Sequence, residues 1–287
     1  MIIVLGKFET NYINKMVSKI PDCDFDDVNT CQSKGSGGHQ GTIMSTNKIY
    51  CAKIISSDTN IEEDLEYKFL MDKQNQKVFK GFIPKFKGLC NDKRKNKKCL
   101  VIENLKCGFD TPVTIDIKIG YHTFNKNILV LKGKPAAIKA IKQKIIDRHS
   151  ASNVSGFRAE GLEGTGKSFT KASLKRMKPE TFLRHFTSTD VDDRALKKII
   201  SRLKKFREIV ESEKYDNYIM AGSSILITYD AVNPKKVSVK IIDFANSNRY
   251  EKLTSVVDRK FNSQYRKAID NLVYQFENYL MLTRYSK

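Results

Sequence analysis

Few residues in this sequence of 287 belong to the types that build structural metal sites. There are four histidines and six cysteines, and no two cysteines form a C-x-x-C pair. Because structural zinc sites need closely spaced thiolate and imidazole ligands, a zinc site is not expected. The cysteines are expected to pack as small hydrophobic side chains.

Long hydrophobic runs are absent as well. No stretch approaches the roughly 20 consecutive apolar residues that a membrane-spanning helix needs. The apolar opening at residues 1–6 is short, and neither a basic region nor a small-residue cleavage site accompanies it. It is therefore expected to form a strand and not a signal peptide. The sequence predicts a soluble protein of the cytoplasm, the nucleus or both.

Acidic residues are scarce relative to basic ones. The 52 Lys and Arg residues outnumber the 32 Asp and Glu residues, which gives a net charge of +20. This excess attracts anions, and nucleic acid, an anionic membrane or a small polyanion would each fit it. Composition alone favours nucleic acid, but no recognition-helix or RNA-binding signature is identified, nor a membrane-binding amphipathic helix. Neither nucleic acid nor membrane is expected as a partner, and a basic nucleic-acid-binding protein remains the non-enzymatic alternative.

The first part of the chain has the order of elements found in the small lobe of a kinase. A glycine-rich turn at residues 33–41 precedes a β-branched strand at residues 49–55, which carries Lys53. An acidic amphipathic helix is predicted at residues 62–72, and another strand at residues 98–105.

A strictly alternating segment, PVTIDIKIG, opens the second part of the chain. Period two predicts a strand with apolar side chains on one face and Asp116 beside Lys118 on the other. A helix flanked by basic residues is predicted at 135–148, with an apolar stripe of Ile138, Ile141 and Ile145. The other predicted elements are an amphipathic helix at 192–211, β segments at 223–230 and 237–246, and a closing helix at 266–282.

One segment matches a nucleotide-binding motif by its letters only. Residues 161–168, GLEGTGKS, fit the Walker A pattern, which needs a buried strand before it and a helix after it to direct amides at phosphate. Polar residues precede this segment, and the residues after it show no helical stripe. The glycines are therefore interpreted as a hairpin turn, and Lys167 is given no catalytic role.

A different set of residues meets the needs of phosphoryl transfer. That chemistry requires a lysine on the phosphates of ATP, carboxylates that hold Mg²⁺ and cations near the transferred group. Lys53 lies on a strand after a glycine-rich turn, and Asp243 ends the apolar strand of IIDFAN. Asp116 and Lys118 share one face of an otherwise apolar strand, where they are costly to bury unless paired or used.

The segment PVTIDIKIG fits the P-x-x-x-D-x-K-x-G signature of the inositol polyphosphate kinase family at all of its fixed positions. The sequence resembles this family over about residues 33–250. The further matching segments are SGGH (36–39), FIPKFKG (82–88), SGFRAEG (155–161), SSILITYD (223–230) and IIDFA (241–245).

The resemblance implies an α+β, two-lobed, kinase-like fold, related to protein kinases and ATP-grasp-like, that binds ATP and Mg²⁺ in the cleft. A β-rich, ATP-binding N-lobe is expected over residues 1–106 and a catalytic C-lobe over residues 107–287. Within the C-lobe, residues 132–154 are expected to form the inositol-phosphate-binding helical segment.

The resemblance also implies roles for individual residues. Asp116 and Lys118 are the implied catalytic residues, and Asp243 is the implied metal ligand. The implied ATP-binding residues are Gly37, Gly38, Lys53, Glu103, Asn104, Leu105 and Asp243. The implied substrate-binding residues are Lys132, Lys134, Lys139, Lys142, Lys144, Arg148 and Lys171.

Two details indicate a subtype within the family. SGGH and the aspartate of ITYD resemble the inositol hexakisphosphate kinases, which build a pyrophosphate on an existing phosphate. The sequence therefore favours a monomeric kinase that converts inositol hexakisphosphate to an inositol pyrophosphate. The alternative is an inositol polyphosphate multikinase that acts on ring hydroxyls of lower inositol phosphates, with Asp116 assisting proton removal.

Overall fold

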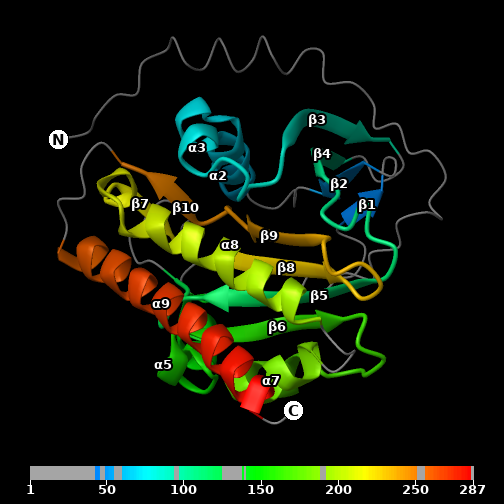
Figure 1. The fold of residues 1–287 in the computed structure, drawn as a ribbon. Helices are drawn as coiled ribbons and strands as arrows, with labels where there is room; N and C mark the ends of the chain where they lie inside the picture. Colours follow the sequence, from blue (N-terminus) through cyan, green and yellow to red (C-terminus); the bar gives the residue numbers. More distant parts are fainter. Residues whose placement is uncertain are drawn as a thin grey trace, which may run out of the picture.

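The computed structural model describes residues 43–45, 49–54, 60–93, 97–124, 138, 140–187, 192–250 and 256–285. Two four-stranded antiparallel sheets and a two-stranded ribbon make up its β structure. Figure 1 shows one sheet above the other, with the longest helices packed along the lower one.

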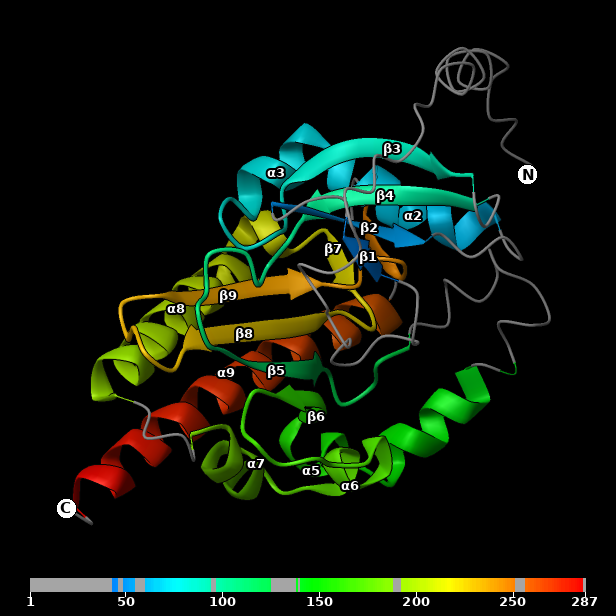
Figure 2. The same cartoon turned by 90° about the vertical axis from the view of Figure 1, so that its right-hand side faces the viewer.

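The first sheet is formed by the N-terminal elements in the order β1-β2-β4-β3. Its strands are β1 (Ile43–Ser45), β2 (Tyr50–Ile54), β3 (Phe86–Asp92) and β4 (Lys97–Glu103). Helices α2 (Asn60–Met71) and α3 (Lys73–Val78) lie beside it (Figure 2). The strands predicted at residues 49–55 and 98–105 and the helix predicted at residues 62–72 are thereby confirmed.

Aromatic packing fixes helix α2 against the second sheet. The ring of Phe69 stacks on that of Phe244, with centroids 4.5 Å apart, and both side chains are buried. The backbone NH of Ile241 donates to the carbonyl of Phe82 at 2.6 Å. Since one hydrophobic cluster includes residues from both parts of the chain, the elements before and after residue 106 are held in a fixed relation. The division into lobes at that residue stays a prediction.

The second sheet has the order β6-β5-β8-β9 and contains the alternating segment at its centre. Its strands are β5 (Pro112–Ile119), β6 (Phe157–Glu163), β8 (Ser224–Asp230) and β9 (Val237–Ile242). The four apolar residues of β5 are fully buried, as period two predicts. Asp116, on the opposite face, is only 4% exposed. The central strand is therefore enclosed on both faces.

Helices cover this sheet on its apolar side. The long helices are α8 (Asp193–Glu211), which confirms the prediction at residues 192–211, and α9 (Val256–Tyr285). Three short helices, α5 (Ser152–Ser155), α6 (Lys171–Arg176) and α7 (Pro179–Phe186), lie near β6. The turn η1 (Glu213–Tyr215) leads into β7 (Tyr218–Met220), which pairs with β10 (Ser247–Arg249). Within the described ranges, no helix has the length and hydropathy that crossing a membrane requires.

Helix α9 begins ten residues earlier than the sequence pattern predicts, at Val256 instead of 266. Val256 is 72% exposed, so the first turn shows no apolar face. Phe261 anchors the early turns by packing on Ile219 and Ala221. This tertiary contact, which has no local signal, accounts for the added length.

Candidate active site

Lys53 lies at the centre of a three-residue charge cluster between the two sheets. Its Nζ donates to both carboxylate oxygens of Glu66 on α2, at 2.9 and 3.0 Å. It also donates to Oδ1 of Asp243, at 3.1 Å. A strand lysine paired with a helix glutamate and facing an aspartate beyond a later strand is the arrangement that protein kinases use around ATP. The structure thus brings Lys53 and Asp243 together, as predicted.

Glu66 is a site residue that the sequence interpretation missed. The helix at residues 62–72 was predicted, but it contains several acidic residues and none was singled out. Only the packing of α2 against the sheet decides which one faces Lys53, and Glu66 is 7% exposed. The order of a lysine strand followed by an acidic helix was the available signal.

Asp243 adopts an unusual backbone conformation directly after β9. Its φ of 66° is the one positive φ of a non-glycine residue among the described residues. A branched or bulky residue is rarely held in this region, whereas aspartate tolerates it better. The conformation directs the carboxylate at two ammonium groups, since Oδ1 accepts from Lys53 at 3.1 Å and Oδ2 from Lys118 at 3.5 Å.

Strand β5 presents Asp116 and Lys118 on the face that points toward Asp243. Lys118 Nζ also donates to the carbonyl of Gly222 at 2.7 Å. Asp116 is buried, and its Oδ1 has no hydrogen-bond partner. A buried carboxylate oxygen without a hydrogen-bond partner is uncommon, because it loses its contacts with water and gains no other hydrogen bond. Asp116, Lys118 and Asp243 are therefore gathered at one place, and Asp116 retains a free acceptor.

The pKa values of the two aspartates in the cluster are shifted in opposite directions. Burial raises the pKa of Asp116 to about 7, with Lys118 opposing the shift and Asp243 adding to it. Burial acts in the same direction on Asp243, but Lys53 and Lys118 outweigh it and hold the pKa of that carboxyl well below its usual range. Burial opposes the charge on Lys53, yet Glu66 and Asp243 raise the pKa of its ammonium group. Asp243 is therefore anionic at neutral pH, whereas Asp116 has a pKa close to 7.

The implied ATP-binding residues Glu103, Asn104 and Leu105 lie between the two sheets. The Glu103 carboxylate accepts from Lys240 Nζ at 3.2 Å and from the backbone NH of Lys85 at 3.1 Å. The backbone NH of Asn104 donates to the carbonyl of Ile49. With Leu105 next in the chain, these contacts tie the segment to both sheets, and its role in binding ATP stays a prediction.

The basic residues of the predicted substrate platform are only partly within the described structure. Lys142, Lys144 and Arg148 are exposed on a helix that includes residues 140–148, and Lys171 is exposed at the start of α6. Gly37, Gly38, Lys132, Lys134 and Lys139 lie outside the described residues.

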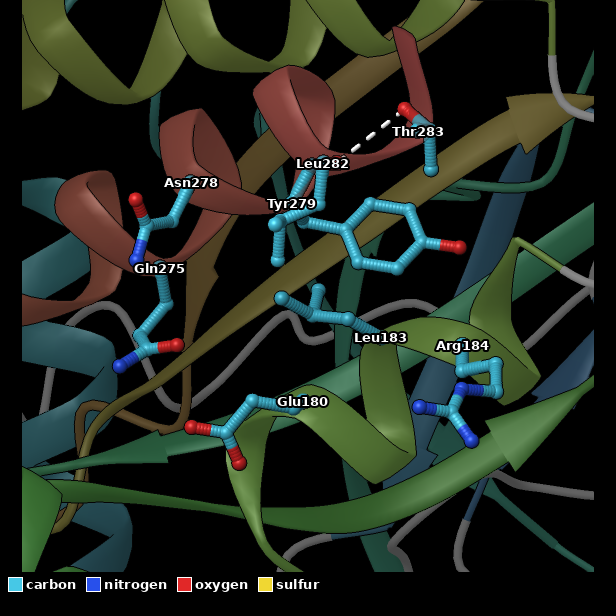
Figure 3. A pocket seen from close by; sticks show the side chains of 8 residues that line it. All are labelled: Glu180, Leu183, Arg184, Gln275, Asn278, Tyr279, Leu282 and Thr283. Carbon is cyan, nitrogen blue, oxygen red and sulfur yellow. Dashed lines mark hydrogen bonds between the residues drawn. The ribbon is translucent and has the colours of Figure 1, made fainter. Parts of the chain in front are cut away.

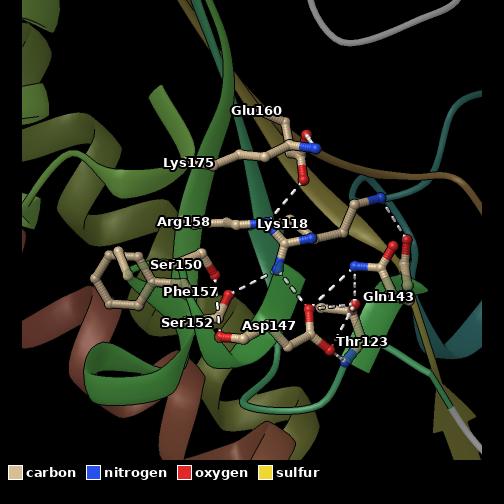
Figure 4. A network of polar contacts seen from close by, with 12 residues as sticks. Lys118, Thr123, Gln143, Asp147, Ser150, Ser152, Phe157, Arg158, Glu160 and Lys175 are labelled. Carbon is tan, nitrogen blue, oxygen red and sulfur yellow. Dashed lines mark hydrogen bonds and ion pairs between the residues drawn. The ribbon is translucent and has the colours of Figure 1, made fainter. Parts of the chain in front are cut away.

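A buried polar network joins that helix to strand β6 of the second sheet (Figure 4). Asp147 accepts from Arg158 Nη1 at 2.7 Å and from the backbone NH of Thr123 at 2.8 Å. Arg158 is 1% exposed, and its Nε donates to Glu160 at 2.8 Å. In strand register Arg158 lies opposite Lys118. Asp147 therefore anchors the basic helix beside Lys118.

Glu160 occupies a bulge in β6. The register changes from Asp116 opposite Gly161 to Ile117 opposite Ala159, which leaves Glu160 without a partner on β5. Bulges redirect side chains, often beside functional sites. Here the carboxylate lies between Arg158 and Lys175, the latter at 3.4 Å, and close enough to Asp116 to raise its pKa.

The Walker-like segment does not form a phosphate-binding loop. Residues 157–163 belong to β6, whose pairing with β5 is antiparallel, whereas the motif occurs in parallel βαβ units. Lys167 is exposed. The expected hairpin was wrong in one respect, because Gly164 and Gly166, both with positive φ, begin a turn that leads into α6 and not into a second strand. The polar residues before the segment also proved to be part of a buried strand.

A cavity of about 440 Å³ lies elsewhere, between α7 and α9. Figure 3 shows the ring of Tyr279 above Leu183, with Glu180 and Arg184 at the margins. None of the predicted site residues lines it. Among the residues that the structure describes, no group of three or more His, Cys, Asp or Glu side chains is placed to hold a metal ion.

Comparison with known proteins decides the family. The family model described as inositol polyphosphate kinase matches residues 99–277, which include Asp116, Lys118 and Asp243. This chain belongs to the inositol polyphosphate kinase family. The resemblance stated from the signature segment is confirmed.

The relatives are distant in sequence. Inositol-trisphosphate 3-kinase A of Rattus norvegicus is 24% identical over 201 residues, which cover 59% of this chain and 42% of the relative. The Homo sapiens protein of the same name is 24% identical over 199 residues, with the same coverage. The chain thus spans less than half the length of these relatives.

Solved structures establish the fold. The inositol phosphate multikinase Ipk2 of S. cerevisiae, in complex with ADP and Mn²⁺, superposes with a TM-score of 0.63 at 18% identity, covering 81% of this chain and 99% of that one. A second inositol phosphate multikinase structure gives a TM-score of 0.58, also at 18% identity, covering 76% and 99%. The expected two-lobed, kinase-like α+β fold is confirmed.

Proposed function

We propose that this family member transfers the γ-phosphoryl group of ATP to an inositol polyphosphate. The convergence of Lys53, Asp116, Lys118 and Asp243 at one place is the observation that carries the proposal. The relatives are named as inositol phosphate kinases, and one solved relative holds ADP and Mn²⁺, which supports ATP and a divalent cation as the donor pair.

Each charged group has a separate task in this proposal. Lys53, held by Glu66, binds the α- and β-phosphates of ATP, and Lys118 contacts the group in transfer. The partly exposed Asp243 carboxylate, held anionic by Lys53 and Lys118, fits a divalent cation because it is a hard oxygen donor. When bound there, Mg²⁺ would neutralise charge on the donor phosphates.

A ring hydroxyl is the acceptor that the site favours. Its oxygen attacks the γ-phosphorus, the bond to the β-phosphate oxygen breaks, ADP leaves, and Asp116 takes the hydroxyl proton. A base with a pKa near the working pH suits this step, and the pKa of Asp116 is about 7. An inositol trisphosphate, the substrate named for the curated relatives, offers free hydroxyls.

One of the two sequence details that indicated a pyrophosphate product has a structural explanation, and the other, SGGH, lies outside the described residues. Asp230, the aspartate of ITYD, accepts from the backbone NH groups of Asp110 at 2.7 Å and Val232 at 3.1 Å. It is 1% exposed and stabilises the turns around β5 and β8. It therefore gives no support to inositol hexakisphosphate as the acceptor.

The proposal is tested with inositol tris-, pentakis- and hexakisphosphates incubated with ATP and Mg²⁺, with products resolved by phosphorus NMR. New monoester resonances from the lower inositol phosphates are expected. A pyrophosphate resonance from the hexakisphosphate would instead identify a phosphate acceptor. Absence of any product, together with tight binding to an oligonucleotide, would contradict kinase activity.

A further inference from the structure

A row of cations runs along helix α8 on the flank that faces away from α9. Lys198, Arg202 and Lys205 recur at intervals of four and three residues, so they project within about 60° of one another around the helix. On the other flank, Lys204 pairs with Glu277 of α9. Figure 1 shows α8 in yellow-green at the front of the molecule, with α9 beside it. The row therefore lies on the side of α8 that α9 leaves uncovered.

Two neighbouring segments add lysines beside this row. Arg202 Nη2 donates to the carbonyl of Gly81 at 2.7 Å, next to the exposed Lys80. Lys198 Nζ donates to the carbonyl of Lys235 at 2.6 Å, in the turn between β8 and β9. Three segments of the chain thus bring cations to one place. Four exposed lysines and one half-buried arginine form what we name the α8 basic surface: Lys80, Lys198, Arg202, Lys205 and Lys235.

Acidic side chains do not neutralise the α8 basic surface. Among the residues that the structure describes, none of its five members forms an ion pair with an acid. Arg194, one turn before Lys198, is bound by Asp192 and is not counted with them. The acids of α8 project at least about 80° away from Lys198 around the helix; they are Asp193, Glu208 and Glu211. Since like charges four residues apart, such as Lys198 and Arg202, destabilise a helix slightly, an anionic partner would relieve their repulsion.

We propose that the α8 basic surface binds the phosphate backbone of a nucleic-acid duplex without reading its sequence. From Lys198 to Lys205 the row extends about 10 Å, a length over which one strand of a duplex presents about three phosphates. The three cations of the row match that number, and Lys80 and Lys235 extend the contact beside it. The net charge of +20 adds long-range attraction for a polyanion.

The chemistry of this surface favours a nucleic acid over a protein or a membrane. Protein interfaces depend on aromatic or aliphatic anchors, and helices that bind membrane interfaces insert an apolar stripe. Of the large exposed hydrophobic side chains that the structure describes, none lies on α8, and only Val232 lies within three residues of a member of the α8 basic surface. Lysine and arginine alone supply sequence-independent binding to a phosphate backbone.

The test measures the fluorescence anisotropy of a labelled DNA duplex of mixed sequence, titrated with the full chain at several salt concentrations. For the wild type, the logarithm of the association constant should fall against the logarithm of salt concentration with a slope of about −4, because each phosphate contact contributes about 0.9. The variant K198Q/K205Q should have a slope shallower by about 2 and bind at least about tenfold more weakly at low salt. Glutamine keeps a high helix propensity, so α8 is preserved. The matched control K142Q/K144Q removes two exposed lysines from another helix, with the same loss of charge, and should bind as the wild type does.

Three outcomes would overturn the proposal. The first is an equal slope for K198Q/K205Q and the wild type. The second is a loss of binding in K142Q/K144Q while K198Q/K205Q binds normally, which would place the duplex at the predicted substrate platform. The third is a wild type that binds vesicles containing phosphatidylserine but no duplex at low salt. The proposal is independent of the proposed kinase activity, so K198Q/K205Q should turn over an inositol phosphate at the wild-type rate.

Discussion

Replacing Asp116 with asparagine should stabilise the protein at alkaline pH while it removes the proposed general base. The pKa of this carboxyl is about 7 in the folded protein against an ordinary value of 3.8. Because the folded pKa is the higher one, the stability contribution is complete below the unfolded pKa and is lost as pH rises through the folded pKa. The ionised Asp116 therefore lowers the free energy of unfolding of the wild type, and the loss is complete above about pH 7.

The size of the effect follows from the pKa difference. About three pH units at about 1.4 kcal/mol per unit give a cost of about 4 kcal/mol when Asp116 is fully ionised. About 2 to 3 kcal/mol of this should develop between pH 5 and pH 8. Asp116 is almost fully buried, so solvent screening reduces this cost only slightly.

Denaturant unfolding of wild type and Asp116→Asn at pH 5, 6, 7 and 8 measures this difference. The free energy of unfolding of the variant should exceed that of the wild type by an amount that grows with pH and levels off above about pH 7. Asp147→Asn is the matched control, since it neutralises a buried carboxylate that is paired with Arg158, and it should destabilise the protein by about 3 kcal/mol. If Asp116→Asn is no more stable than the wild type at pH 8, the placement of Asp116 is wrong.

Three further predictions concern activity. Glu66→Gln should lower kcat about 10- to 100-fold in steady-state assays with little change in thermal stability, because Lys53 loses the anion that orients it. An unchanged kcat would contradict this role. Lys144→Ala should raise KM for the inositol phosphate about threefold to tenfold with kcat retained, since it removes one exposed cation of the platform; an unchanged KM would remove Lys144 from that platform. Arg158→Lys should raise the KM for the inositol phosphate more than it lowers kcat. The helix that carries Asp147 is held less firmly, while Lys118 stays in place. A loss of ATP affinity of the same size, measured by calorimetry, would indicate general unfolding instead.

The sequence was most informative where local periodicity and tertiary structure agree. The alternation around Asp116 predicted β5 with the correct faces, because period two reflects the two sides of a strand and depends on no distant contact. The needs of phosphoryl transfer singled out Lys53 and Asp243, and the signature at Asp116 and Lys118 then supplied the family. The long amphipathic helix α8 was predictable for a similar local reason.

Prediction failed where a distant partner decides the outcome. Nothing near Glu66 distinguishes it from the other acids of its helix, and only the packing of α2 brings it to Lys53. The isoleucine stripe has the periodicity of a buried helix face but is exposed, because Arg158 determines which side of that helix is buried. The early start of α9 likewise depends on Phe261 contacting residues some forty positions earlier.

In the proposed mechanism, Asp116, Lys118 and Asp243 act together on a nucleotide held by Lys53. The most direct test is a single-turnover measurement of labelled phosphate transfer from ATP to an inositol phosphate. The wild type and Lys118→Met are compared, and the ATP affinity of each is determined in parallel. We predict that the variant binds ATP with an affinity within about threefold of the wild type but transfers phosphate at least about a hundredfold more slowly. Equal transfer rates in the two proteins would contradict this mechanism.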